Sequence, residues 1–144
     1  AIARSPVHLA ELLARRPWAG FPYLLQSYEH SESNFVTHAV CVAGRIVSHI
    51  SYKQYLGEET SIRMARPVRN ELYEPSAATL EIFERFLTPL AYDGPCCVDY
   101  AMRPNGDPLI FEINPRLGGS LLLSGHEPDL AKTISAVLEH AGRN

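Results

Sequence analysis

Two polar side chains, Glu112 and Asn114, interrupt a stretch that otherwise has the composition of a buried strand, PLIFEINPR at residues 108–116. Side chains alternate between the two faces of a strand, so Ile110, Glu112 and Asn114 are expected on one face. Carboxylate and amide oxygens on one face are the ligands that a hard cation such as Mg²⁺ or Mn²⁺ prefers. The spacing therefore indicates a metal site.

A turn signal before this strand adds a second carboxylate. The dipeptide Asn-Gly at 105–106 follows the β-prone stretch CCVDYAMR and is a strong hairpin signal. A turn centred there places Asp99 directly opposite Glu112, and a four-residue loop at 104–107 gives the same pairing. It also places Cys97 opposite Asn114. Two carboxylates about 5 Å apart repel each other unless something compensates, and a divalent cation would do so.

Arg116 follows Asn114 by two residues and keeps the same side if the chain stays extended. Its guanidinium group matches phosphate or carboxylate oxygens bidentately. The residues Gly118, Gly119 and Ser120 come next and offer backbone N–H groups that an anion can approach. Because Mg²⁺ is usually held by one or two carboxylates plus substrate phosphates, phosphate oxygens would complete its shell. The alternative is a solvated face, which antiparallel sheets commonly have.

The elements around this hairpin predict an α+β fold, an antiparallel sheet with helices packed on one face. We expect helices at 6–16 and 76–92 and from about 128 on, strands at 22–29, 34–43, 45–54, 96–103 and 109–114, and loops at 55–72 and 115–127. The apolar stripes of the second and third helices comprise Leu80, Phe83, Leu87 and Leu90, and Leu130, Ile134, Val137 and Leu138.

Composition limits the function. The 144 residues have the length of a single domain, 1–144. A net charge of −3 provides no basic field for nucleic acid, and no apolar run is long enough for a membrane-spanning helix. Cys41, Cys96 and Cys97 lack metal-ligand spacing and indicate reduced thiols in a cytoplasmic protein. The chain starts without Met, so we expect a piece of a longer protein.

The stretch from Asp93 to Leu130 resembles the C-terminal half of an ATP-grasp domain, closest to the carbamoyl-phosphate-synthetase-like carboxylate–amine ligases. The specific motif is EINPR with an acid 13 positions before its Glu. The resemblance implies that Asp99 and Glu112 bridge one or two Mg²⁺ (or Mn²⁺) ions and that Asn114 ligates one. It implies a catalytic role for Glu112 and for Arg116, which would contact the transferring phosphate or the intermediate.

A weaker resemblance extends upstream, into LLQSYEHSE. There it implies an adenine hinge made by Gln26, Ser27, Tyr28 and Glu29, with Glu32 near the ribose. Many members have a glycine before that last acid, where this chain has Ser31. The alternative for these side chains is that they are ordinary exposed residues at a strand end.

Further basic residues could reach substrate carboxylate or phosphate: Lys53, Arg63, Arg66 and Arg69. A solvated, charged loop is the alternative. The histidines, His38 and His49 among them, show no ligand spacing and receive no role. The substrate-binding domain and phosphate-contacting lobe of the family do not precede Ala1, so the resemblance predicts a missing N-terminal lobe. Apolar surface left by that lobe could drive self-association into a homo-oligomer.

The resemblance implies ATP-dependent activation of a small-molecule carboxylate as an acyl phosphate, which an amine attacks to form an amide with release of ADP and phosphate. Positioning and electrostatics carry such catalysis, and no nucleophilic side chain is needed. Two alternatives stay open. One is a carboxylation or phosphotransfer enzyme of the same superfamily, and the other is a non-catalytic module for nucleotide binding or assembly.

Overall fold

The computed structural model describes residues 3–15, 22, 24–27, 33–55 and 69–141. The chain divides into two units, Ala1–His30 and Ser31–Asn144. The prediction of a single domain stays a prediction. No helix in the described ranges is long and apolar enough to cross a membrane.

Among its described residues, the first unit forms one helix, α1 (Pro6–Ala14). The Ser5 hydroxyl accepts a hydrogen bond from the backbone N–H of His8 (3.1 Å), and proline occupies the first turn, so the predicted start is confirmed. Residues 22 and 24–27 form neither helix nor strand, and the strand predicted at 22–29 is wrong there. Leu24 is 82% exposed, and β-forming side chains without a partner strand do not make a sheet.

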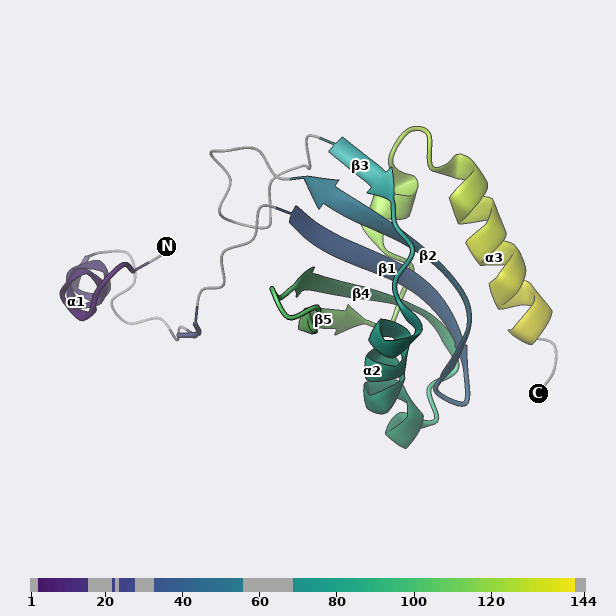
Figure 1. Cartoon of the computed structure of the whole chain (residues 1–144), viewed down its shortest axis with the longest axis horizontal. Coiled ribbons are helices and arrows are strands. Elements are labelled where there is room, and N and C mark those ends of the chain that lie inside the picture. The colour runs from purple at the N-terminus through teal and green to yellow at the C-terminus, as the bar shows by residue number, and fades with distance from the viewer. Residues whose placement is uncertain (1–2, 16–21, 23, 28–32, 56–68, 142–144) are drawn as a thin grey trace. The chain divides into compact units, whose positions relative to one another are not determined.

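The second unit is a five-stranded antiparallel sheet with helices (Figure 1). Its elements are β1 (Ser33–Val42), β2 (Arg45–Tyr55), β3 (Arg69–Leu72), α2 (Ala77–Leu87), η1 (Thr88–Leu90), β4 (Gly94–Met102), β5 (Pro108–Asn114), η2 (Gly119–Leu122) and α3 (Glu127–Ala141). The strand order is β3-β2-β1-β4-β5, and every neighbouring pair is antiparallel. The α+β class and the antiparallel sheet are confirmed.

The helices are divided between the two faces of the sheet, where the sequence predicted one face. On one face α2 packs against β1 and β4, with Phe83 fully buried beside Tyr100. On the other, Leu121 of η2 packs against Val36 and Cys97, and α3 contacts β1, β2 and β4. Because strand side chains alternate, each strand in the middle of the sheet contributes to both cores.

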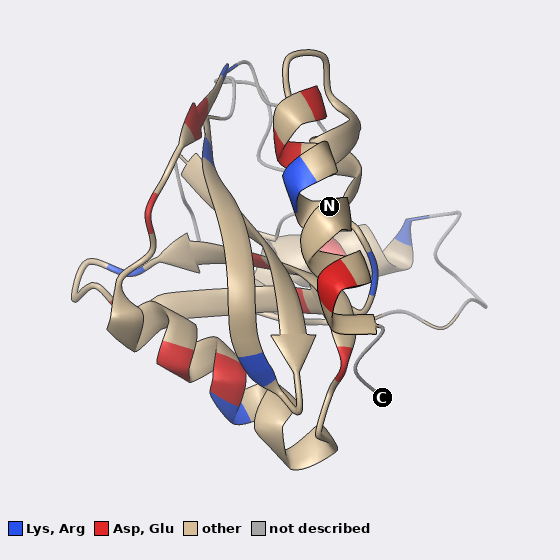
Figure 2. Cartoon of the chain, turned by 90° about the vertical axis from the view of Figure 1, so that its right-hand side faces the viewer, with Lys and Arg blue, Asp and Glu red and all other residues tan. Residues whose placement is uncertain are grey.

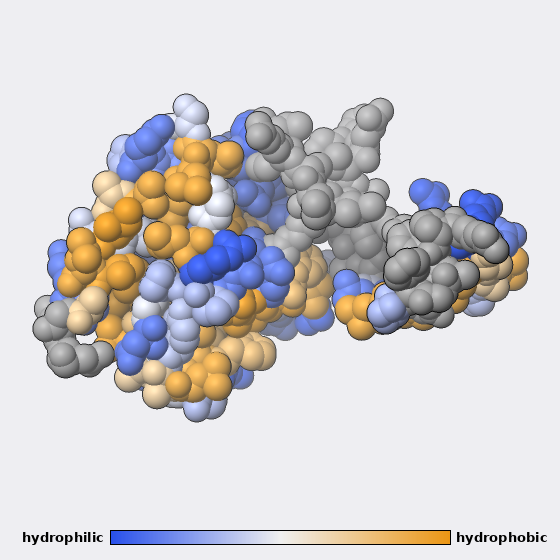
Figure 3. All heavy atoms as spheres, turned by 180° about the vertical axis from the view of Figure 1, so that it is seen from behind, coloured by the Kyte–Doolittle hydropathy of each residue, from blue (hydrophilic) through white to orange (hydrophobic). Residues whose placement is uncertain are grey.

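Both predicted helix stripes are only partly buried. Leu90 is 73% exposed because α2 ends at Leu87 and the chain tightens into η1. In α3 the fully buried residues are small, Thr133 and Ala136, whereas Leu138 is 68% exposed. Small side chains let the helix lie close to the sheet. Figure 3 shows apolar side chains, among hydrophilic ones, at the surface on the α3 side of the second unit.

The third strand, β3, occupies the end of the predicted 55–72 loop. Residues of β3 pair with β2, Leu72 opposite Tyr52 and Arg69 opposite Tyr55. The side chain of Arg69 bonds Glu71 and lies over the ring of Tyr55. The loop prediction is therefore wrong at 69–72, where an edge strand forms.

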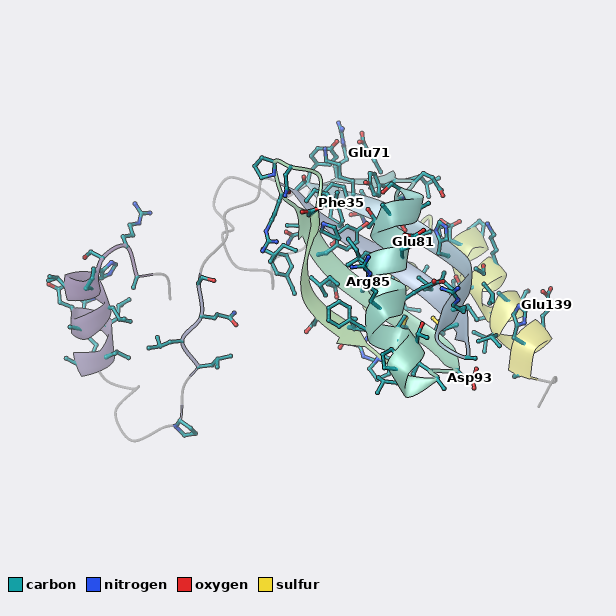
Figure 4. All side chains as sticks on the ribbon, turned by 60° about the horizontal axis from the view of Figure 1, so that its bottom comes forward. Phe35, Glu71, Glu81, Arg85, Asp93 and Glu139 are labelled. Atoms are coloured by element: carbon teal, nitrogen blue, oxygen red, sulfur yellow. The ribbon has the colours of Figure 1, made fainter. Side chains whose placement is uncertain are left out.

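The β1–β2 turn is fixed by the chain that follows α2. Gly44 has φ +76°, and a Cβ there would lie 2.3 Å from the Cα of Thr88. Asp93, labelled in Figure 4, accepts a hydrogen bond from the backbone N–H of Ala43 (2.7 Å). The hairpin predicted around Gly44 is confirmed, and glycine is required both for the conformation and for the close approach.

Candidate functional site

The β4–β5 hairpin holds the predicted carboxylates opposite each other. Asp99 pairs with Glu112, and Cys97 pairs with Asn114, as predicted. The route to this pairing differs from the predicted one. Met102 pairs with Pro108, so the loop spans residues 103–107, which by itself would pair Asp99 with residue 111.

A β-bulge restores the pairing. Between Asp99 and Tyr100 the register shifts, so Tyr100 pairs with Ile110 and Phe111 is the extra residue of β5. The bulge changes the face on which Ile110 lies. Ile110 and Ile113 both pack in the core beneath α2, so the predicted grouping of Ile110 with Glu112 is wrong.

Two rows of side chains cross the face of the sheet that η2 and α3 partly cover. The first row runs through Tyr52, Val36, Asp99 and Glu112 on β2, β1, β4 and β5. The second runs through Ile50, His38, Cys97 and Asn114 on the same strands. Asp99 and Glu112, the acidic pair, therefore lie at the β4–β5 side of a face whose centre is buried.

The donor set suits a hard cation. Asn114 donates a hydrogen bond from Nδ2 to Oε1 of Glu112 (3.0 Å), and turning its amide would present Oδ1 instead. Asp99 is half-buried beside the Cys97 thiol, whose Sγ lies 3.9 Å from Oδ2. In the described ranges no group of three or more His, Cys, Asp or Glu side chains is arranged so that it could hold a metal ion. A site here would thus comprise two carboxylates and one amide oxygen, a set that fits Mg²⁺ or Mn²⁺.

The chain bends directly after Asn114. The backbone N–H of Arg116 donates to the carbonyl of Asn114 (2.8 Å), a three-residue turn. The expectation that the chain stays extended to Arg116 is therefore wrong. Arg116 is exposed, and its Nη1 donates to the carbonyl of Leu117 (3.1 Å). The guanidinium group retains further N–H donors for an anion.

The two glycines after Arg116 differ in their surroundings. Gly118 is buried, and a Cβ there would lie 2.4 Å from Cε1 of His38 and 2.6 Å from Sγ of Cys97. Gly119 is exposed, with no other atom within 4 Å of a Cβ. Gly118 therefore serves close packing of the loop on the sheet, a role the sequence did not indicate.

A polar network next to the hairpin was missed at the sequence level. His38 is 1% exposed, and its Nε2 lies 2.8 Å from Oγ of Ser120. The backbone carbonyl of Ser120 accepts a hydrogen bond from Nδ1 of His126 (2.9 Å). His126 stacks on Tyr52, with ring centroids 4.3 Å apart, and the Tyr52 hydroxyl donates to Asp129. The only sequence signal was His38, which lies in the largely apolar run FVTHAVCVA.

Burial and nearby charge set the protonation states in this network. Burial, with a smaller contribution from the charge of His126, lowers the pKa of His38 to about 4, so His38 is neutral at neutral pH. Burial raises the pKa of Tyr52, and its bond to the Asp129 carboxylate raises it further. Both groups therefore act through hydrogen bonds and not as charges.

The remaining candidates are spread over the molecule. Gln26 and Ser27 are exposed residues of the first unit, outside any strand. Lys53 lies on the α2 face, over the rings of Phe35 and Tyr55, and so on the face opposite the acidic pair. Tyr28, Glu29, Glu32, Arg63 and Arg66 lie outside the described residues.

No protein-family model and no curated protein sequence matches this chain. The site described above is thus characterised by its own residues. Figure 2 shows that both α2 and α3 carry acidic and basic residues together.

Proposed function

We propose that this chain is the C-terminal part of an ATP-grasp ligase that uses ATP and Mg²⁺ (or Mn²⁺) to join a small-molecule carboxylate to an amine. The observation that carries the proposal is the pairing of Asp99 with Glu112, with Asn114 on the same face. This arrangement has the residue types and order of the family motif. A solvated sheet face would not require two acids directly opposite each other.

In this proposal Asp99, Glu112 and Asn114 hold the metal ion, which when bound would neutralise charge on the β- and γ-phosphates. Arg116, exposed on the bend that follows, binds and orients the transferring phosphoryl group through its guanidinium fork. Glu112 is catalytic in the sense that it touches the same ion. No side chain forms a covalent intermediate. The carboxylate attacks the γ-phosphorus, ADP leaves, and the amine then displaces phosphate from the acyl phosphate.

The proposal also includes an adenine hinge made by Gln26, Ser27, Tyr28 and Glu29, with Glu32 near the ribose. An N-terminal lobe would complete the phosphate site. The proposed location is cytoplasmic. Cys41 and Cys96 are buried and form no disulfide, which supports it, because buried thiols suit a reducing compartment.

The activity test uses the protein with its N-terminal lobe and ³¹P NMR to follow ATP in the presence of candidate carboxylates and amines. We expect ADP and phosphate to appear together with an amide, and Asp99→Asn or Glu112→Gln to abolish turnover without unfolding the chain. Retained turnover in both variants would refute the proposal. Carboxylated or phosphorylated products in place of an amide would support the second enzyme class of the same superfamily.

A further inference from the structure

A buried histidine of the sheet, His38, holds the loop that follows the acidic pair. His38 lies at the centre of β1, with Cys97 as its neighbour on β4 and Asn114 one strand further. Its Nε2 lies 2.8 Å from Oγ of Ser120, four residues after Arg116. The imidazole thus connects β1 to the loop that carries Arg116.

The hydrogen-bonding surroundings of His38 favour one tautomer. Nδ1 is buried and has no hydrogen-bond partner. A buried N–H without an acceptor costs more than a buried lone pair without a donor. The proton is therefore placed on Nε2, which donates to the Ser120 hydroxyl, while Nδ1 keeps its lone pair.

Two further contacts hold the same loop. Gly118 packs directly on the His38 ring and the Cys97 thiol, so the loop cannot lie closer to the sheet. On the far side, His126 donates to the Ser120 carbonyl. Ser120 is thus held by one histidine through its side chain and by another through its backbone.

We propose that His38 is a positioning residue that, through Ser120, fixes the segment from Arg116 to Ser120 beside the acidic pair. An apolar side chain at position 38 would avoid the cost of the unsatisfied Nδ1, so the contribution specific to the imidazole is its bond to Ser120. The inference rests on the proposed function only for the ligand of Arg116, the triphosphate of ATP. The position of the loop itself is independent of that function.

The test compares four variants of the 144-residue chain by amide hydrogen exchange. Ser120→Ala and His38→Leu remove the bond. Ser120→Thr keeps the hydroxyl, and His38→Gln keeps an N–H that can reach it. We expect exchange of the amides at 117–123 to rise roughly tenfold in the first two, with β1 and β4 unchanged, and to stay near wild type in the last two.

A second measurement separates positioning from general packing. We expect the ¹⁵N spectrum of His38 in the wild-type chain to show the Nε2–H tautomer, and Ser120→Ala to alter its Nε2 signal. A wild-type Nδ1–H tautomer would overturn the inference. So would unchanged exchange of the loop in Ser120→Ala, or a rise spread equally over the sheet.

Binding of Mg·ATP is measured on the same variants in the protein with its N-terminal lobe, which the proposed phosphate site requires. It distinguishes the inference from the function on which its ligand rests. A roughly three- to tenfold weaker Kd in Ser120→Ala, restored in Ser120→Thr, supports both. A loosened loop in a chain whose wild type does not bind Mg·ATP upholds the positioning of the loop and counts against the proposed function. If the wild type binds Mg·ATP, and Ser120→Ala loosens the loop without changing the Kd, then the position of the loop does not serve ligand binding. That result overturns the positioning role for the ligand.

Discussion

Asp99 lies directly opposite Glu112 because β5 contains one residue more than β4 between the hairpin loop and this pair. The extra residue, Phe111, forms a β-bulge. Bulges bend a strand and are frequent next to active sites, where they redirect side chains. Here the bulge allows Ile110 and Ile113 to face the core beneath α2 while Glu112 stays on the opposite face with Asp99.

Replacing Gly118 by alanine should destabilise the second unit. The backbone at Gly118 (φ −80°, ψ 146°) suits any residue, so the whole effect comes from a Cβ placed 2.4 Å from the His38 ring. We expect a loss of about 1–3 kcal/mol in the free energy of unfolding, measured by urea denaturation. Gly119→Ala is the matched control, with open space around its Cβ, and should change it by no more than about 0.5 kcal/mol. Equal effects would contradict the close contact.

Stability should fall on acidification because of His38. Its pKa is about 4 in the folded chain and about 6.5 in the unfolded chain. Between these values the unfolded chain binds a proton that the folded chain does not, so the free energy of unfolding decreases as the pH falls from 6.5 to 4. The decrease is complete below pH 4 and amounts to about 3 kcal/mol.

His38→Gln should remove this part of the pH dependence, as measured by urea denaturation between pH 4 and 7. The control is His8→Gln, on α1 of the other unit, which leaves His38 and its contacts in place. A His38→Gln chain with the same slope as wild type would show that His38 is not the group responsible.

The hydroxyl of Tyr52 should contribute more than that of Tyr55. Tyr52 is 2% exposed and donates to Asp129, whereas the Tyr55 hydroxyl donates to Glu71 at the surface (2.7 Å). We expect Tyr52→Phe to cost about 1–2 kcal/mol in the free energy of unfolding, because it leaves a half-buried carboxylate without its donor, and Tyr55→Phe about 0–0.5 kcal/mol. Thermal unfolding followed by circular dichroism would compare them, and similar values for both would argue against the network.

Alanine substitutions at Gly44 and Gly106 distinguish the stability cost of backbone strain from that of steric overlap. Both have positive φ, +76° and +85°, but only Gly44 lies against another part of the chain, the backbone of Thr88. We expect Gly106→Ala to cost about 1 kcal/mol for its conformation alone. Gly44→Ala should cost on the order of 3 kcal/mol or more. Chemical denaturation of both variants measures the difference, and a Gly44→Ala chain as stable as Gly106→Ala would mean that the turn can move away from Thr88.

Local signals in the sequence predicted the helix starts and the hairpins. Ser5 and Ser76 each cap a helix as expected, since capping depends on a few neighbouring residues. The strand predicted at 22–29 was wrong over the described residues 22 and 24–27, and so was the burial of Leu138. Strand pairing and helix orientation depend on distant segments.

In the site, the pairing of Asp99 with Glu112 was predicted correctly, but from a loop of the wrong length. The loop is longer than predicted, and the bulge at Phe111 compensates for the difference in register. The network of His38, Ser120 and His126 was not predicted. Its members lie far apart in the sequence and meet only when η2 packs on the sheet. No spacing rule within the chain indicates such contacts.

The central claim is that the acidic pair binds a metal ion together with ATP. Calorimetric titration of Mg²⁺ into the chain with ATP present tests it most directly, on wild type, on Asp99→Asn/Glu112→Gln, and on the charge-matched control Glu81→Gln/Glu139→Gln. The control residues lie on α2 and α3, as Figure 4 shows. We predict metal-dependent binding in wild type and in the control, and its loss in the Asp99/Glu112 variant. Binding retained in that variant would contradict the account.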